Sequence, residues 1–244
     1  MAGRAIDAVI FDLDNTLTDF MLAKETSIRA AAEAMVDAGL PMAADEATDG
    51  IFAIYKDRGI EHQRVFNLFL TETMGRVEDR ILAAAVVAYR RARDGSLVLY
   101  PHAKLVLNQL LKDGYKLAVV SDAPRFEAWL RLVYLGLQHT FDLVLTYDDT
   151  GFRKPAPEPF RMALDELGVA PSRAVIIGDW KERDIAGGRN AGLHTVYARY
   201  GDKYSQYADK AEADETEPDF VVDDLLQLLN VLDRLNGGPV GRKD

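Results

Sequence analysis

The sequence contains no cysteine and only four histidines among its 244 residues. The absence of cysteine excludes disulfides, thiolate metal sites and a cysteine nucleophile. Long apolar runs are also missing: the longest, 81–88, is far too short to cross a bilayer, so no membrane partner is expected. The N-terminal residues lack the pattern of a secretory signal, and we expect a cytoplasmic protein.

Basic residues are the scarcer charge, with 29 Lys and Arg against 39 Asp and Glu and a formal net charge of −10. Nucleic acid is therefore not expected as a partner, because a phosphate backbone needs a basic surface. A small phosphorylated substrate is also an anion. An acidic enzyme that binds one must concentrate positive charge locally, with a metal ion or a few lysines.

Short apolar runs alternate with amphipathic helical patterns over most of the chain. Most of the runs are apolar without alternation, which is typical of parallel strands buried on both faces. The pattern therefore predicts an α/β fold, a doubly wound parallel sheet with helices on both faces. Strands are expected at 8–11, 117–120, 143–146, 174–177, 195–198 and 220–222, and helices at 103–113, 125–136, 157–168, 184–191 and 223–235.

Residues 20–96 interrupt this alternation, because they show helical patterns but no strand pattern. We expect an all-helical domain inserted into a core domain formed by 1–19 and 97–244. Lys24 in its first helix could reach a site mouth or be solvated. Four aromatic side chains with helical spacing are interpreted as core rather than substrate contacts: Phe52, Tyr55, Phe66 and Phe69.

Polar side chains follow four of the expected strands, at the edge where open parallel sheets bind ligands. Crowded carboxylates repel unless a cation neutralises them or a proton is shared. Without cysteine or a neighbouring histidine, the ligands are hard oxygens, which favour Mg²⁺. The residues are Asp12, Asp14 and Thr16 after the first strand, Ser121 after the second, Lys154 beyond the third, and Asp179 and Asp184 after the fourth.

These residue types suit phosphoryl transfer. The ammonium group of Lys154 and the hydroxyl of Ser121 can bind phosphate oxygens. A carboxylate such as Asp12 can act as a nucleophile and form an aspartyl-phosphate. Asp14, two residues further on, can donate a proton to the leaving oxygen and later accept one from water.

Four motifs in order resemble those of the haloacid dehalogenase (HAD) superfamily: D-L-D-N-T at 12–16, serine at 121, K-P-A-P at 154–157 and G-D-x4-D at 178–184. The resemblance implies a Rossmann-like α/β core with a helical cap. It implies that Asp12 is the nucleophile and Asp14 the general acid and base. It places Mg²⁺ on Asp12, the carbonyl of Asp14, Asp179 and Asp184. It assigns Thr16, Ser121 and Lys154 to the phosphoryl group, with Thr16 also orienting the loop.

The position of the insertion indicates the subfamily. Asp14 and Ser121 are 107 residues apart (121 − 14), whereas Ser121 and Lys154 are 33 apart (154 − 121). The cap therefore follows the first motif, which is the C1 type. This arrangement resembles enzymes acting on sugar phosphates, glyceraldehyde 3-phosphate, phosphoglycolate or nucleotides, as monomers or homodimers. Three residues depart from the usual family pattern: Asp122, Trp180 and Arg183.

Three alternatives to a phosphatase are open. A haloacid dehalogenase has the same fold, but such enzymes usually lack the second acid, and Asp14 counts against this interpretation. A phosphomutase is not excluded by any residue. A phospho-accepting receiver module, which is a signalling domain rather than an enzyme, would also carry acids, a hydroxyl and a lysine on a parallel sheet. The helical insertion and the distal G-D-x4-D motif argue against it.

Overall fold

The computed structural model describes residues 4–202 and 216–237 of the chain. Two compact units are present, one formed by Met1–Asp19 with Leu99–Asp244 and the other by Phe20–Val98. The second boundary follows Val98, where the sequence led us to expect it after Ser96. Each unit is described separately below.

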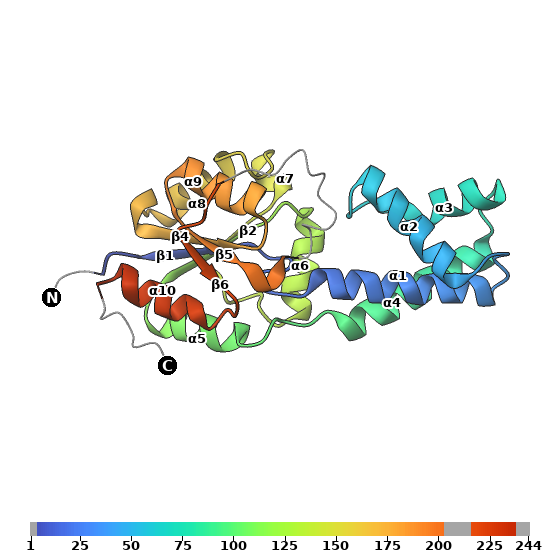
Figure 1. Ribbon diagram of the computed structural model, residues 1–244, viewed down its shortest axis with the longest axis horizontal. Helices are drawn as coiled ribbons and strands as arrows, with labels where there is room; N and C mark the ends of the chain where they lie inside the picture. The colour runs from blue at the N-terminus through green and yellow to red at the C-terminus, as the bar shows by residue number, and fades with distance from the viewer. Residues whose placement is uncertain (1–3, 203–215, 238–244) are drawn as a thin grey trace. The chain divides into compact units, whose positions relative to one another are not determined.

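The larger unit contains a six-stranded sheet in the order β3-β2-β1-β4-β5-β6, and every neighbouring pair is parallel. The strand order reverses between β1 and β4, which lie side by side at the centre (Figure 1). The predicted α/β fold class is confirmed. The strands are β1 (Ala8–Phe11), β2 (Lys116–Val120), β3 (Leu143–Leu145), β4 (Ala174–Gly178), β5 (His194–Ala198) and β6 (Phe220–Val222).

Helices cover both faces of this sheet: α8 and α9 lie on one side and α5 and α10 on the other (Figure 1). The helix expected at 184–191 is different, because a π-helical turn at Lys181–Ile185 precedes a shorter α9. The helices are α5 (Ala103–Lys112), α6 (Arg125–Tyr134), α7 (Tyr147–Thr150), α8 (Glu158–Leu167), α9 (Ala186–Ala191) and α10 (Gln227–Leu235).

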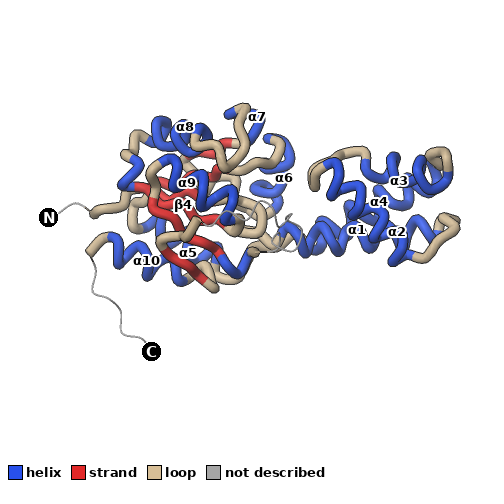
Figure 2. The backbone as a smooth tube through the Cα atoms, turned by 45° about the horizontal axis from the view of Figure 1, so that its top comes forward, coloured by secondary structure: helices blue, strands red, loops and turns tan. Residues whose placement is uncertain are grey.

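The smaller unit consists of helices and loops (Figure 2). Its helices are α1 (Phe20–Asp37), α2 (Ala44–Arg58), α3 (Val65–Met74) and α4 (Asp79–Ser96). Tyr55, Phe66 and Phe69 are buried in its core and Phe52 is partly buried against it, as predicted. Lys24 is buried rather than solvated, since only 7% of it is exposed. Its Nζ lies 4.1 Å from the ring centroid of Tyr55, a cation–π distance.

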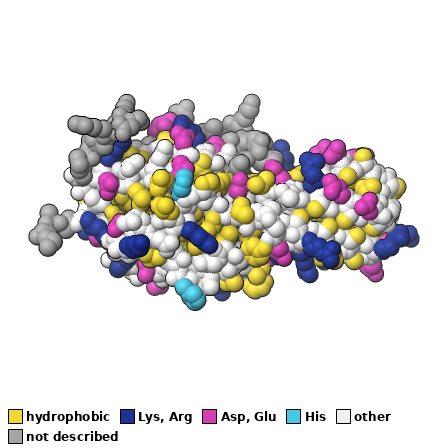
Figure 3. Space-filling model, turned by 90° about the horizontal axis from the view of Figure 1, so that it is seen from below, with side chains coloured by type: hydrophobic (Ala, Val, Ile, Leu, Met, Phe, Trp, Pro, Cys, Tyr) yellow, Lys and Arg dark blue, Asp and Glu magenta, His cyan; other side chains and the backbone are white. Residues whose placement is uncertain are grey.

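The surface carries charges of both signs. On the face drawn in Figure 3, acidic and basic side chains are interspersed in each unit, without a large area of one sign. Among the described residues, no helix is both long enough and apolar enough to span a membrane.

Gly188 tests the packing of α9 on the sheet. A Cβ at this position would lie 2.3 Å from Cγ2 of Ile176 in β4. We expect Gly188→Ala to lower the free energy of unfolding by about 1–3 kcal/mol through overpacking, measured by urea denaturation. The control is Gly95→Ala in α4, where nothing lies within 4 Å. That change should be neutral or stabilising by up to about 1 kcal/mol. Equal stability of the Gly188→Ala protein and wild type would contradict the packing described.

Candidate active site

The two central strands bring their following residues to one edge of the sheet. Asp12 comes directly after β1 and Asp179 directly after β4. The strands run parallel in register, with Phe11 opposite Ile177, and the Asp12 N–H donates to the Ile177 carbonyl at 3.0 Å. Ligands in such sheets bind at the carboxyl ends of the strands where the order reverses. The two acids occupy that point.

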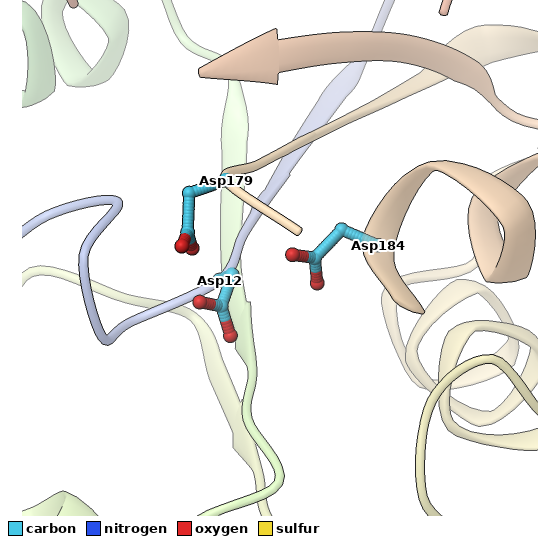
Figure 4. Close-up of side chains that lie close together, drawn as sticks. All are labelled: Asp12, Asp179 and Asp184. Atoms are coloured by element: carbon cyan, nitrogen blue, oxygen red, sulfur yellow. The ribbon is translucent and has the colours of Figure 1, made fainter. Parts of the chain in front are cut away.

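Three carboxylates meet there. Asp12, Asp179 and Asp184 each offer one oxygen, and these oxygens all lie within 4.8 Å of one another. Figure 4 shows the side chains pointing toward one another from the ends of β1 and β4 and from the turn before α9. Gly178 permits this approach, because a Cβ there would lie 2.3 Å from Cγ of Asp184. The Trp180 N–H donates to Oδ2 of Asp184 at 3.1 Å and holds it.

Lys154 lies among these acids. Its Nζ donates to Oδ1 of Asp12 and to Oδ1 of Asp184, both at 2.5 Å, and to the carbonyl oxygen of Val120 at 3.3 Å. All three ammonium hydrogens therefore have acceptors. The lysine is 5% exposed, so water screens these interactions weakly. One positive charge faces three buried carboxyl groups.

The protonation of the site reflects this crowding. Burial raises the pKa of Asp12 to about 7, Lys154 opposes the shift, and Asp184 and Asp14 add to it. Burial also raises the pKa of Asp179 well above its usual value, with Asp12 and Asp184 contributing. Burial alone would lower the pKa of Lys154, but Asp12 and Asp184 raise it overall, so it stays an ammonium ion.

The residues fit a bound divalent cation. Oδ2 of Asp179 is buried and accepts no hydrogen bond from any residue that the structure describes, whereas its Oδ1 accepts one from the Thr16 hydroxyl at 3.1 Å. A desolvated carboxylate oxygen without a donor is costly unless an ion contacts it. Oxygen is the only donor type that the cluster offers, which favours a hard cation such as Mg²⁺.

The remaining predicted residues lie around the cluster. The Ser121 hydroxyl, directly after β2, accepts a hydrogen bond from the Ala123 N–H at 3.1 Å. Asp14 lies outside the three-carboxylate cluster, and its Oδ2 accepts a hydrogen bond from Nη1 of Arg131 at 3.0 Å. The sequence analysis missed Arg131, a buried arginine on α6. Nothing in the pattern of that amphipathic helix marks it, because the contact depends on how α6 is rotated.

A second missed feature supports the loop that carries Asp14. Asn15 adopts a left-handed conformation (φ 59°). The hydroxyl of Tyr200 donates to the Thr16 carbonyl at 2.7 Å. A Cβ at Gly201 would lie 1.8 Å from the Asn15 carbonyl oxygen, so only glycine fits this close approach. In the sequence, the only signal of this contact is that Gly201 follows the expected strand 195–198. Its partner, Asn15, is far away in the sequence.

The sequence that builds this site matches the model of one protein family. The family model of the haloacid dehalogenase-like hydrolases matches residues 6–192. This range includes Lys154 and the three acids of the cluster. The chain belongs to this family. The resemblance noted from the four motifs is thereby confirmed.

Several relatives are similar to this chain over nearly their full length. A glyceraldehyde 3-phosphate phosphatase of Methanopyrus kandleri is 36% identical over 232 residues, covering 94% of this chain and 98% of that protein. A protein of the same name from Methanothermobacter thermautotrophicus is 32% identical over 231 residues, covering 93% and 100%. The crystal structure of a HAD phosphatase from Thermococcus onnurineus shares the fold, with a TM-score of 0.67, 24% identity and coverage of 93% and 98%.

Lys154→Met tests the charge balance. We expect it to lower the free energy of unfolding of the metal-free protein by about 3–5 kcal/mol at pH 8, because two buried carboxylates lose their cation. Chemical denaturation in chelator measures the change. The control is Arg189→Met, which breaks the exposed 3.4 Å pair with Asp219 and should cost less than about 1 kcal/mol. Equal effects of the two substitutions would contradict the charge balance.

The stability of the metal-free protein should depend on pH. With its pKa raised to about 7, folded Asp12 holds a proton that the unfolded chain releases near its ordinary value of about 3.9. The folded state therefore binds more protons between about pH 4 and pH 7, and the free energy of unfolding should fall as pH rises through this window. Acids whose pKa is lowered by folding, such as Asp7, change the free energy of unfolding only at pH values below this window.

Thermal unfolding in chelator from pH 5 to pH 8 measures this dependence. Asp12→Asn should reduce this dependence without abolishing it, because Asp12 no longer titrates while burial still raises the pKa of Asp179. Stability that increases across this range in the wild-type protein would show that Asp12 does not titrate as described.

Proposed function

We propose that this protein is a Mg²⁺-dependent phosphatase that hydrolyses a small phosphorylated metabolite through an aspartyl-phosphate on Asp12. The observation that carries the proposal is the buried cluster of Asp12, Asp179 and Asp184 around Lys154 at the point where the strand order reverses. A cation and a lysine at one desolvated point supply the positive charge that a transferring phosphoryl group needs.

We assign the roles from the contacts of each side chain and from the resemblance to the family. Asp12, Asp179 and Asp184 would hold Mg²⁺, together with the backbone carbonyl of Asp14 that the family resemblance implies. Lys154 steadies Asp12 and binds a phosphoryl oxygen with Ser121. Thr16 orients Asp179 through its hydroxyl and keeps the loop in place beside the phosphoryl group. When bound, Mg²⁺ neutralises charge on the phosphoryl oxygens and on the nucleophile.

The reaction has two steps. In the first, a carboxylate oxygen of Asp12 attacks phosphorus, the bond from phosphorus to the ester oxygen breaks, and Asp14 gives that oxygen a proton. In the second, a water oxygen attacks phosphorus, the bond from phosphorus to the Asp12 oxygen breaks, one proton of the water passes to Asp14, and inorganic phosphate leaves with the Asp12 carboxylate restored. Arg131 bonds to Asp14 and fixes where its carboxyl group lies between steps.

The substrate class rests on the relatives. Two that match over nearly their full length are named glyceraldehyde 3-phosphate phosphatases. Glyceraldehyde 3-phosphate is therefore the first substrate to test, followed by phosphoglycolate, sugar phosphates and nucleoside monophosphates.

A phosphate-release screen over these compounds tests the function. We expect turnover that requires Mg²⁺ and that is lost with chelator. Asp12→Asn should reduce release to background because the nucleophile is gone, and Asp14→Asn should reduce it by about 10²–10⁴-fold because a general acid is lost. Asp165→Asn, an exposed acid on α8, is the control and should leave turnover unchanged.

Other outcomes of the screen separate the alternatives. Undiminished release by the Asp12→Asn protein would sink the nucleophile assignment. Halide release from 2-chloro acids that survives chelation would support a dehalogenase instead. Transfer of phosphate between two positions of a sugar without net release would support a mutase.

A further inference from the structure

Asp122, one of the three departures noted in the sequence, connects two loops of the site. It follows Ser121 at the end of β2, and 14% of its side chain is exposed. Its Oδ1 accepts the backbone N–H of Lys154 at 3.0 Å, and its Oδ2 accepts Nη1 of Arg183 at 3.2 Å. One carboxylate therefore binds the loop before α8 and the turn before α9.

Arg183 extends this connection to Asp184. It lies in the π-helical turn, and its Cζ lies 3.8 Å from the ring centroid of Trp180. The Trp180 N–H in turn donates to Oδ2 of Asp184 at 3.1 Å. The three residues that depart from the family pattern, Asp122, Trp180 and Arg183, thus form one continuous set of contacts.

The carbonyl of Asp122 makes a further contact with the lysine loop. It accepts Nη1 of Arg153 at 3.0 Å, and Cζ of Arg153 lies 4.1 Å from the ring centroid of Tyr147 in α7. Asp122 therefore holds the loop at two consecutive residues, Arg153 and Lys154. Residues in loops have fewer backbone hydrogen bonds and packing contacts than residues in helices or strands. Contacts such as those of Asp122 therefore decide where a loop side chain points.

We propose that Asp122 is a positioning residue that fixes Lys154 and Asp184 relative to each other. The proposal rests on the proposed function, in which Lys154 binds the phosphoryl group and Asp184 the metal. Nζ of Lys154 lies 2.5 Å from Oδ1 of Asp184, and a displacement of either loop alters that pair. Asp122 lies outside the cluster of Asp12, Asp179 and Asp184, and we infer that it acts through these two residues.

Substitutions can separate the two contacts. Asp122→Asn keeps an oxygen for the Lys154 N–H but loses the ion pair with Arg183. Asp122→Ala loses both contacts. Arg183→Met keeps the aliphatic part over Trp180 but removes the donor to Asp122. Arg183 is 38% exposed, so its ion pair adds little to stability, and the effects should fall on the site geometry.

The experiment measures Mg²⁺ affinity by calorimetry, together with kcat and KM for substrate. We expect Asp122→Ala to weaken Mg²⁺ binding and to lower kcat/KM by about 10–100-fold each, the usual effect of removing a contact that orients a ligand. Asp122→Asn and Arg183→Met should each weaken Mg²⁺ binding by less. The double variant Asp122→Asn with Arg183→Met should bind Mg²⁺ no more weakly than whichever single variant binds it more weakly. The reason is that both substitutions remove the same ion pair.

The matched control is Asp7→Asn. Asp7 and Arg173 form an ion pair just before β1 and β4, at the opposite end of the strands that carry the site, with Nε 2.5 Å from Oδ2. This variant should keep Mg²⁺ affinity and kcat/KM within about twofold of wild type. An equal loss in Asp7→Asn would show that general loosening of the fold explains the effect, and would overturn the proposal.

Two further outcomes are decisive. Asp122→Ala with Mg²⁺ affinity and kcat/KM within about twofold of wild type would overturn the positioning role. If Asp122→Ala does not fold, the same criterion applies to Asp122→Asn and Arg183→Met. The wild-type protein could release phosphate from none of the substrates while the Asp122 variants still bind Mg²⁺ more weakly than wild type. In that case the proposed function fails and the positioning of Asp184 by Asp122 stands.

Discussion

Three carboxyl groups and one lysine share a buried space at the centre of the sheet edge, and their mutual electrostatics constrain everything around them. Each carboxylate loses most of its hydration there, which is costly without compensation. Lys154 compensates Asp12 and Asp184 directly, while Oδ2 of Asp179 accepts no hydrogen bond from the described residues. The remaining negative charge is relieved by a proton or by a metal ion, so the acid–base state and the metal affinity of this site are two aspects of one balance.

The fold can hold such a cluster because the strand order reverses between β1 and β4. Loops diverge at this point and leave space for a ligand. Close backbone approaches then complete the site. Gly178 lets Asp184 lie against the end of β4, and Gly201 lets the segment after β5 lie against the Asn15 carbonyl. A side chain at Gly178 would displace Asp184, and one at Gly201 would displace the loop after β1 that carries Asp14.

The fold class and the strand ends were predictable because buried parallel strands are continuous apolar runs, and the residue after each run must lie at the sheet edge. This reasoning placed Asp12 and Asp179 without any knowledge of rotations or side-chain packing. Contacts such as Arg131 with Asp14 and Tyr200 with Thr16 were not predictable, since they join residues 117 and 184 positions apart through helix and loop orientation. The turn at 181–185 was also missed, because its widened form depends on Asp184 folding back onto the Trp180 N–H.

An acidic protein that binds an anion must find its positive charge somewhere, and the pairing at this edge indicates where. Lys154 is paired with Asp12 and Asp184, Arg131 with Asp14, and Arg183 with Asp122. Each of these three cations is therefore matched by at least one acid before any ligand arrives, whereas Arg153 contacts the neutral carbonyl of Asp122 and the ring of Tyr147. A bound metal ion would add positive charge that attracts a phosphoryl group, and metal and phosphate binding would then be mutually dependent. Each should tighten the other, because each removes the repulsion that opposes the other.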